Sequence, residues 1–194
     1  MAIALALVAA LVLALAPEAG AQGMRKIGTS RSARKTRTVV VLQSLEDGRR
    51  YASIVDRKRP ALDRLDGTLR SSASEAQVAA FLESGELLLV DERVDYGEAG
   101  GTARNRYYVS DGRLVYYESL HVRPRDVGED RLPARDEVLT SLAFGENGAL
   151  VGSEKTVNRE PVALGPTEEP RVRQCFEALA AKVDESLGKK AKKR

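Results

Sequence analysis

Tight turns between short apolar runs constrain the fold of this chain most. Residues 105–110 and 113–120 flank Asp111-Gly112, and residues 139–144 and 149–158 flank Glu146-Asn147-Gly148. Asp-Gly supplies the two positive φ angles that a type I′ hairpin turn needs. Residues 86–94 add a strand rich in Leu and Val. Strands joined by such turns predict an antiparallel sheet built from hairpins.

Two segments have the apolar spacing of helices. Ser72-Ala73-Ser74-Glu75 fits a capping box, and Gly85 is placed to end the helix that follows. Thr167 can cap a longer helix, whose apolar stripe continues to Leu187 and ends at Gly188. We therefore expect a short helix before the main run of strands and an amphipathic helix at the C-terminus.

The remaining segments complete an α+β fold. Residues 38–42 and 51–55 predict a first hairpin around Glu46-Asp47-Gly48, while residues 57–70 and 121–136 predict an irregular crossover and a long loop. The predicted fold is a mostly antiparallel sheet. One short helix follows the first two strands, and the C-terminal amphipathic helix packs on the sheet.

The N-terminus has the pattern of a cleavable signal peptide. Residues 2–16 form an unbroken apolar run, and Ala19 and Ala21 form a small-residue cleavage site. We predict cleavage after Ala21 and an exported protein, either periplasmic or secreted. The alternative is that Met24 is the true first residue and that the protein is cytoplasmic.

Basic residues are concentrated at the two ends of the chain. Residues 22–37 and the tail 189–194 hold eleven of the 31 Lys and Arg residues, and both segments are predicted to be disordered. The single domain 38–188 between them has 20 basic and 27 acidic residues, a net charge of −7. The two ends favour weak attraction to an anionic surface. Nucleic acid is not expected as a partner, because the domain is acidic and the basic runs lack stacking aromatic residues.

Residues suited to catalysis or metal binding are scarce. His121 is the one histidine and Cys175 the one cysteine, so the usual zinc spacings and an internal disulfide are excluded. A buried, unreactive Cys175 is favoured over pairing with another chain. The acid pairs Asp91-Glu92 and Asp95/Glu98 are interpreted as a solvated rim. No catalytic residue, metal site or cofactor is predicted.

The two tyrosine pairs of the central hairpin are the feature most suggestive of binding. Adjacent strand residues point to opposite faces, so Tyr107-Tyr108 and Tyr116-Tyr117 must each place one ring on either side. A two-residue turn sets Tyr107 opposite Tyr116, and a three-residue turn shifts the pairing by one; both remain open.

If helices cover only one face, the other face presents a candidate binding surface formed by Tyr108, Tyr117, Arg106 and His121. In the alternative, each helix covers one face and all four rings belong to the core.

These observations predict a small exported, non-catalytic domain that binds a protein or cell-envelope component through the tyrosine-bearing face. One alternative is an envelope-associated structural protein held by its basic tails. Another is a hydrolase that uses His121 or a carboxylate pair.

Overall fold

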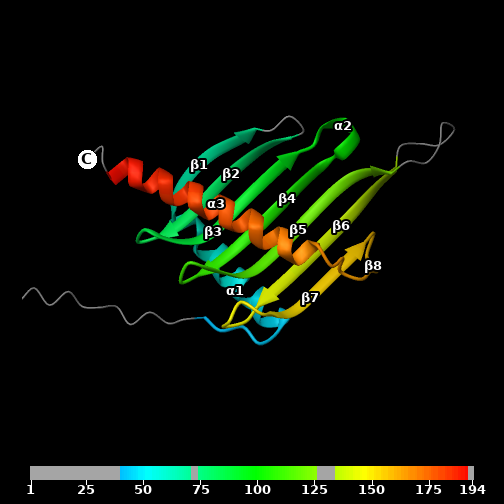
Figure 1. The fold of residues 1–194 in the computed structure, drawn as a ribbon, viewed down its shortest axis with the longest axis horizontal. Helices are drawn as coiled ribbons and strands as arrows, with labels where there is room; N and C mark the ends of the chain where they lie inside the picture. Colours follow the sequence, from blue (N-terminus) through cyan, green and yellow to red (C-terminus); the bar gives the residue numbers. More distant parts are fainter. Residues whose placement is uncertain (1–39, 71–73, 126–133, 192–194) are drawn as a thin grey trace, which may run out of the picture. The chain divides into compact units, whose positions relative to one another are not determined.

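An eight-stranded antiparallel sheet forms the body of the protein, with the strands in chain order from β1 to β8 (Figure 1). The computed structural model describes residues 40–70, 74–125 and 134–191. The predicted signal peptide 1–21 and the basic segment 22–37 lie outside these residues. The α+β class, the antiparallel sheet and the C-terminal helix are confirmed.

The strands are β1 (Asp63–Arg70), β2 (Glu75–Glu83), β3 (Glu86–Asp95), β4 (Thr102–Ser110), β5 (Arg113–Arg125), β6 (Ala134–Phe144), β7 (Leu150–Val157) and β8 (Glu160–Pro161). The helices are α1 (Leu45–Lys58), the single 3₁₀ turn η1 (Arg59–Ala61), the four-residue α2 (Gly97–Gly100) and α3 (Glu168–Ala191). The helix α3 begins as predicted but continues past Gly188, so the first residues of the predicted disordered tail are helical.

The predicted first hairpin is wrong, because its second half is the helix α1. Ser44 caps this helix by accepting a hydrogen bond from the amide of Asp47, whose carboxylate accepts one from the amide of Gln43. Ser44 to Asp47 is thus a reciprocal cap. Gly48, read as a turn residue from the sequence, lies buried inside the helix.

The predicted helix after Ser72 is also wrong, because residues 75–83 form β2. This strand has neighbours on both edges and buried side chains on both faces, including Phe81 and Leu82. A strand covered on both sides loses its apolar alternation, which explains the helix-like spacing. Ser84 and Gly85 both have positive φ and form the hairpin turn to β3.

Two segments predicted to be irregular contain strands. β1 occupies residues 63–70 of the expected crossover, and β5 and β6 take up residues 121–125 and 134–136, the two ends of the expected loop. Residues 126–133 lie outside the described part of the chain.

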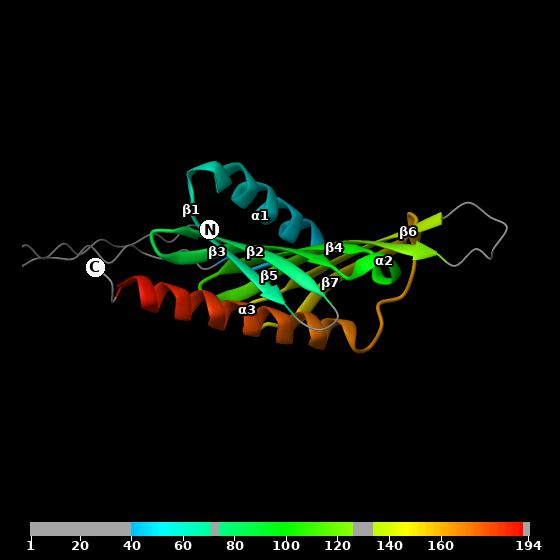
Figure 2. The same cartoon turned by 90° about the horizontal axis from the view of Figure 1, so that it is seen from above.

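One helix covers part of each face of the sheet (Figure 2). On the α1 face, Leu42, Ala52 and Val55 bury a cluster with Phe81, Leu89, Tyr108 and Tyr116. On the α3 face, Val172, Phe176 and Leu179 bury a second cluster with Tyr107, Tyr117, Leu142 and Phe144. The predicted separation of each tyrosine pair onto opposite faces is confirmed.

The hairpin between β4 and β5 combines the two registers left open by the sequence. Asp111 and Gly112 have positive φ, and Ser110 pairs with Arg113 as in a two-residue turn. The register then shifts by one, so Tyr108 lies opposite Tyr116 and Tyr107 opposite Tyr117. A β-bulge therefore places the two tyrosine rings of each face opposite each other. The ring centroids are 5.6 Å apart on the α1 face and 5.1 Å apart on the α3 face.

We predict that Gly48→Ala destabilises the protein although Ala is the better helix former. A Cβ at Gly48 would clash with the Tyr116 ring, which is 1 % exposed and has no room to move. We expect a loss of about 1–3 kcal/mol in the free energy of unfolding, measured by urea denaturation. Gly67→Ala is the control, because its Cβ would meet nothing within 4 Å, and it should change stability by less than about 0.5 kcal/mol. Equal effects of the two variants would refute this packing.

Candidate functional site

The helix α1 crosses the strands instead of running along them, and this leaves part of that face of the sheet uncovered. Near its start, Leu45 lies against Gly152 of β7, and near its end Lys58 bonds Glu83 of β2 at 3.1 Å. A helix is about 10 Å wide, so it covers about three residues of each strand it crosses. Strands of up to 13 residues extend well beyond that band.

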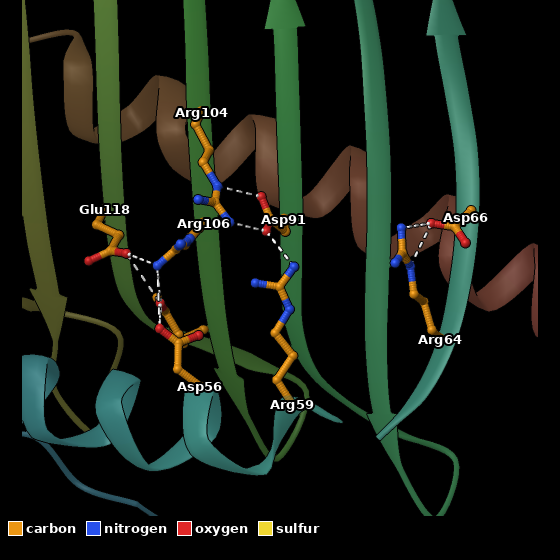
Figure 3. Close-up of polar contacts among 9 residues, drawn as sticks. Asp56, Arg59, Arg64, Asp66, Asp91, Arg104, Arg106 and Glu118 are labelled. Carbon is orange, nitrogen blue, oxygen red and sulfur yellow. Dashed lines mark hydrogen bonds and ion pairs between the residues drawn. The ribbon is translucent and has the colours of Figure 1, made fainter. Parts of the chain in front are cut away.

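A row of mostly charged residues runs beside the helix from β1 to β7. Pairing places its members side by side on neighbouring strands: Asp66, Ala79, Asp91, Arg106, Glu118, Ser141 and Glu154. Helix side chains meet this row, since Arg49 pairs with Glu154 and Asp56 with Arg106, and Arg59 of η1 pairs with Asp91. We call the seven strand residues the charged row; Figure 3 shows the part from Asp66 of β1 to Glu118 of β5.

Asp91 is the most buried charge of the row, with 3 % of its side chain exposed. Arg104 donates two hydrogen bonds to it, at 3.0 and 2.7 Å, and Arg59 donates a third at 2.9 Å (Figure 3). Burial alone would raise the pKa of Asp91, but the bonds from Arg104 and the charges of both arginines outweigh it and hold the pKa below its ordinary value. The Arg59 guanidinium also lies 4.4 Å above the centre of the Phe81 ring.

Arg106 forms the second centre of the row. It donates to Glu118 at 2.8 Å and to Asp56 at 3.3 Å, and the Tyr108 hydroxyl joins the same group (Figure 3). A cavity of about 450 Å³ opens here between α1 and the sheet. Asp56 Oδ1 and Arg106 Nε are buried there and have no hydrogen-bond partner among the described residues.

Beyond the charged row the sheet is bare. The next row across it reads Gln77, Arg93, Arg104, Leu120 and Leu139, from β2 to β6. Leu120 and Leu139 are 39 % and 45 % exposed and lie directly opposite each other. Val122 follows Leu120 on the same face of β5. We call these six residues the open surface.

Two hollows lie on and beside the open surface. One has a volume of about 630 Å³ and is lined by Arg93, Arg104, Leu120 and Val122. The other, of about 560 Å³, lies over β1 to β3 and shares Gln77 and Arg93 with the first. Both volumes fall in the range of small-molecule sites, roughly 300–1,000 Å³.

The structure does not bring the four predicted binding residues together. Arg106 and Tyr108 lie on the α1 face, whereas Tyr117 belongs to the core under α3 and His121, four residues along β5, shares its face. Tyr108 is fully buried and Tyr117 is 7 % exposed. The prediction of exposed rings on a bare face is therefore wrong, and the alternative, with one helix over each face and the rings in the core, is the arrangement found. The sequence pattern did not reveal α1, which covers Tyr108.

The α3 face holds a compact polar network instead. The Asn105 amide donates to Glu92 at 2.8 Å and accepts hydrogen bonds from Tyr117 and Ser119 at 3.1 and 2.8 Å. Burial raises the pKa of Tyr117 to about 12, so its phenol stays protonated and donates. His121 Nε2 lies 3.0 Å from the carbonyl of Gly100, and its ring stands beside Tyr96.

Two further predictions are corrected. Cys175 is exposed and not buried, because it lies beside the buried stripe of Val172, Phe176 and Leu179 and not within it. Asp91 does not belong to a solvated rim with Glu92; the two acids point to opposite faces and each is hydrogen-bonded there. Within the described residues, no group of three or more His, Cys, Asp or Glu side chains is arranged to hold a metal ion.

No protein-family model matches the chain, and neither a curated protein nor a solved structure matches it significantly. Among the described residues, none of the helices has both the length and the apolarity to span a bilayer.

We predict that Asp91→Asn lowers the free energy of unfolding by about 3 kcal/mol, because it removes a buried anion and leaves two partly buried guanidinium groups without their anionic partner. Asp66→Asn is the matched control in the same row. Asp66 pairs with Arg64 at 2.7 Å, but both side chains are more than half exposed, so the expected loss is below about 1 kcal/mol. Chemical denaturation measures both, and similar losses would show that burial does not set the strength of these pairs.

We predict that the contribution of Asp91 disappears in acid. Its pKa in the folded protein is below that of the unfolded chain, about 3.9 for an ordinary Asp. The folded state therefore binds fewer protons in this window, and stability falls as the pH falls through it. The stability difference between the wild type and Asp91→Asn should shrink from about pH 5 to pH 3. A difference that is independent of pH would contradict the assignment.

Proposed function

We propose that this protein is an exported, non-catalytic binding domain that holds its ligand on the open surface. The observation that carries this proposal is a hollow lined by Arg93, Arg104 and Leu120. A second exposed leucine, Leu139, lies directly opposite Leu120 on the neighbouring strand. Small-molecule sites combine apolar area with a few polar groups that fix orientation. Export is proposed from the signal-like residues 1–21, and weak attraction to the envelope from the basic ends.

The charged row supports this use of the surface because it makes the site rigid. Asp91 fixes Arg104 with two hydrogen bonds, so this guanidinium reaches the hollow from a defined position. Helix α1 and the turn η1 are tied to the same row by ion pairs. A site held in place before the ligand arrives loses less entropy on binding.

The arrangement of reactive groups favours binding over hydrolysis. His121 lies on the opposite side of the sheet from the open surface, with Nε2 engaged by the Gly100 carbonyl. Asp91, the most buried carboxylate of the α1 face, is held in its ionised form by two arginines and suits a positioning role better than proton transfer.

We expect small ligands to bind on the open surface more often than elsewhere. A mixed library of anionic, cationic and neutral fragments can be screened by amide NMR shifts on the purified protein. Shifts should concentrate on Gln77, Arg93, Arg104, Leu120 and Leu139. Leu120→Glu should abolish them, whereas Ile54→Glu, which changes an equally exposed residue of α1, should leave them unchanged. Hits that map to the α3 face or to the sheet edges would refute the proposal.

A further inference from the structure

We propose that the open surface binds a small amphipathic anion, with the anionic head at Arg93 and Arg104 and the apolar tail across Leu120 and Leu139. This inference rests on the proposed function and specifies its ligand class. The four residues follow one another in a single row across β3, β4, β5 and β6. Charge occupies one half of the row and apolar area the other.

The head position follows from an uncompensated charge. Arg93 and Arg104 lie directly opposite each other on neighbouring strands, where like charges repel. Asp91 accepts hydrogen bonds from Nε and Nη2 of Arg104. Arg93 is exposed and forms no hydrogen bond or ion pair with any residue that the structure describes. An anion between the two guanidinium groups would relieve the repulsion and receive a bidentate hydrogen bond.

The nearest carboxylates are already engaged. Glu75 and Asp95 lie opposite each other one row further out. Glu75 pairs with Arg70 at 3.3 Å, and Asp95 accepts a hydrogen bond from the amide of Gly97 at 2.8 Å. Two residues along a strand are about 6.6 Å, so these acids border the head position without filling it. Arg93 is thus the one arginine of the hollow that has no ion-pair partner among the described residues.

The tail position follows from the exposed leucines. Leu120 and Leu139 face each other on β5 and β6, and Val122 extends the apolar area along β5. The step from β3 to β6 crosses three strand spacings, about 14 Å in all. A molecule that covers the whole row is therefore an anion with an unbranched chain of moderate length, such as a fatty acid.

A single dissolved molecule fits this site better than a bilayer does. Helix α1 stands out from the sheet on the same face and beside the open surface (Figure 2). A flat lipid surface would meet the helix before it reached Leu120 and Leu139, whereas one acyl chain can lie down beside it.

Decanoate, decanol and decyltrimethylammonium test the charge requirement, since they share one chain and differ in the head. Each is titrated below its micelle concentration into the purified protein, with binding followed by amide NMR shifts. We expect decanoate to bind at the open surface at least about fivefold more tightly than decanol, and the cation more weakly still. Octanoate should bind about tenfold more weakly than decanoate, because two buried methylenes are lost.

Arg93→Gln should weaken decanoate binding about fivefold without lowering stability, since this side chain has no partner to lose and its repulsion with Arg104 is removed. Arg113→Gln removes an arginine at the opposite end of β5, where it bonds the Glu146 carbonyl, and should leave decanoate binding unchanged. Leu139→Ser should weaken decanoate and decanol alike. Phosphatidylglycerol vesicles should not bind through the open surface, and binding that Leu139→Ser abolishes would transfer the site to the membrane and overturn the proposal.

The results separate the two proposals. If all three amphiphiles bind equally at the open surface, the anionic head is refuted while the binding surface stands. If none of them shifts the amides of the row while library fragments do, the ligand class is refuted. If neither set binds there, the proposed function itself is refuted.

Discussion

The unequal cover on the two faces of one sheet determines what this protein presents to solvent. The 24 residues of α3 make a rod about 36 Å long, enough to cross the opposite face obliquely over most of the strands (Figure 1). The 14 residues of α1 make a rod about 21 Å long. It runs across the strands at one end of its face and can seal only a band there. The apolar cluster below α1 is buried, and the outer halves of β3 to β6 are left open.

The charged row lies at the boundary between these two regions. An isolated charge there would be partly or fully desolvated, which is costly. The chain resolves this with interlocked ion pairs in which Asp91 and Arg106 each have partners on two different elements. The same contacts attach α1 and η1 to the sheet and orient Arg104 toward the hollow. One network of interactions therefore both anchors the helix and positions Arg104 in the candidate site.

Much of the sheet could be predicted because its signals are local. Asp111-Gly112 and the turn near Gly148 mark hairpins by their backbone requirements, and the stripe from Val172 to Val183 marks α3 by its spacing. Both errors come from packing against another element, which the local sequence does not show. Residues 75–83 have both faces covered, so their apolar residues do not alternate, and Gly48 allows a close helix–sheet approach that reads as a turn in the sequence.

The candidate site was predictable only in part. Adjacent residues of a strand point to opposite faces, so the two rings of each tyrosine pair had to lie on different faces, and they do. Which rings stay accessible depends on the position of α1, which is set by long-range contacts such as Arg59 with Asp91 and not by local sequence. The alternation of Leu89, Asp91 and Arg93 along β3 was the available signal. Leu89 lies in the covered core, Asp91 forms the buried ion pair and Arg93 is exposed to solvent.

The most direct test compares thiol reactivity at two positions on the α1 face of β6, four residues apart. Leu139→Cys and Ala143→Cys are made in a Cys175→Ala background, and the rate of reaction with a small maleimide is measured under native conditions. We expect the thiol of Leu139→Cys, on the open surface, to react nearly as fast as in the unfolded chain. The thiol of Ala143→Cys, under α1, should be protected by at least about a hundredfold. Equal protection at both positions would show that the whole face is covered and that no open surface exists.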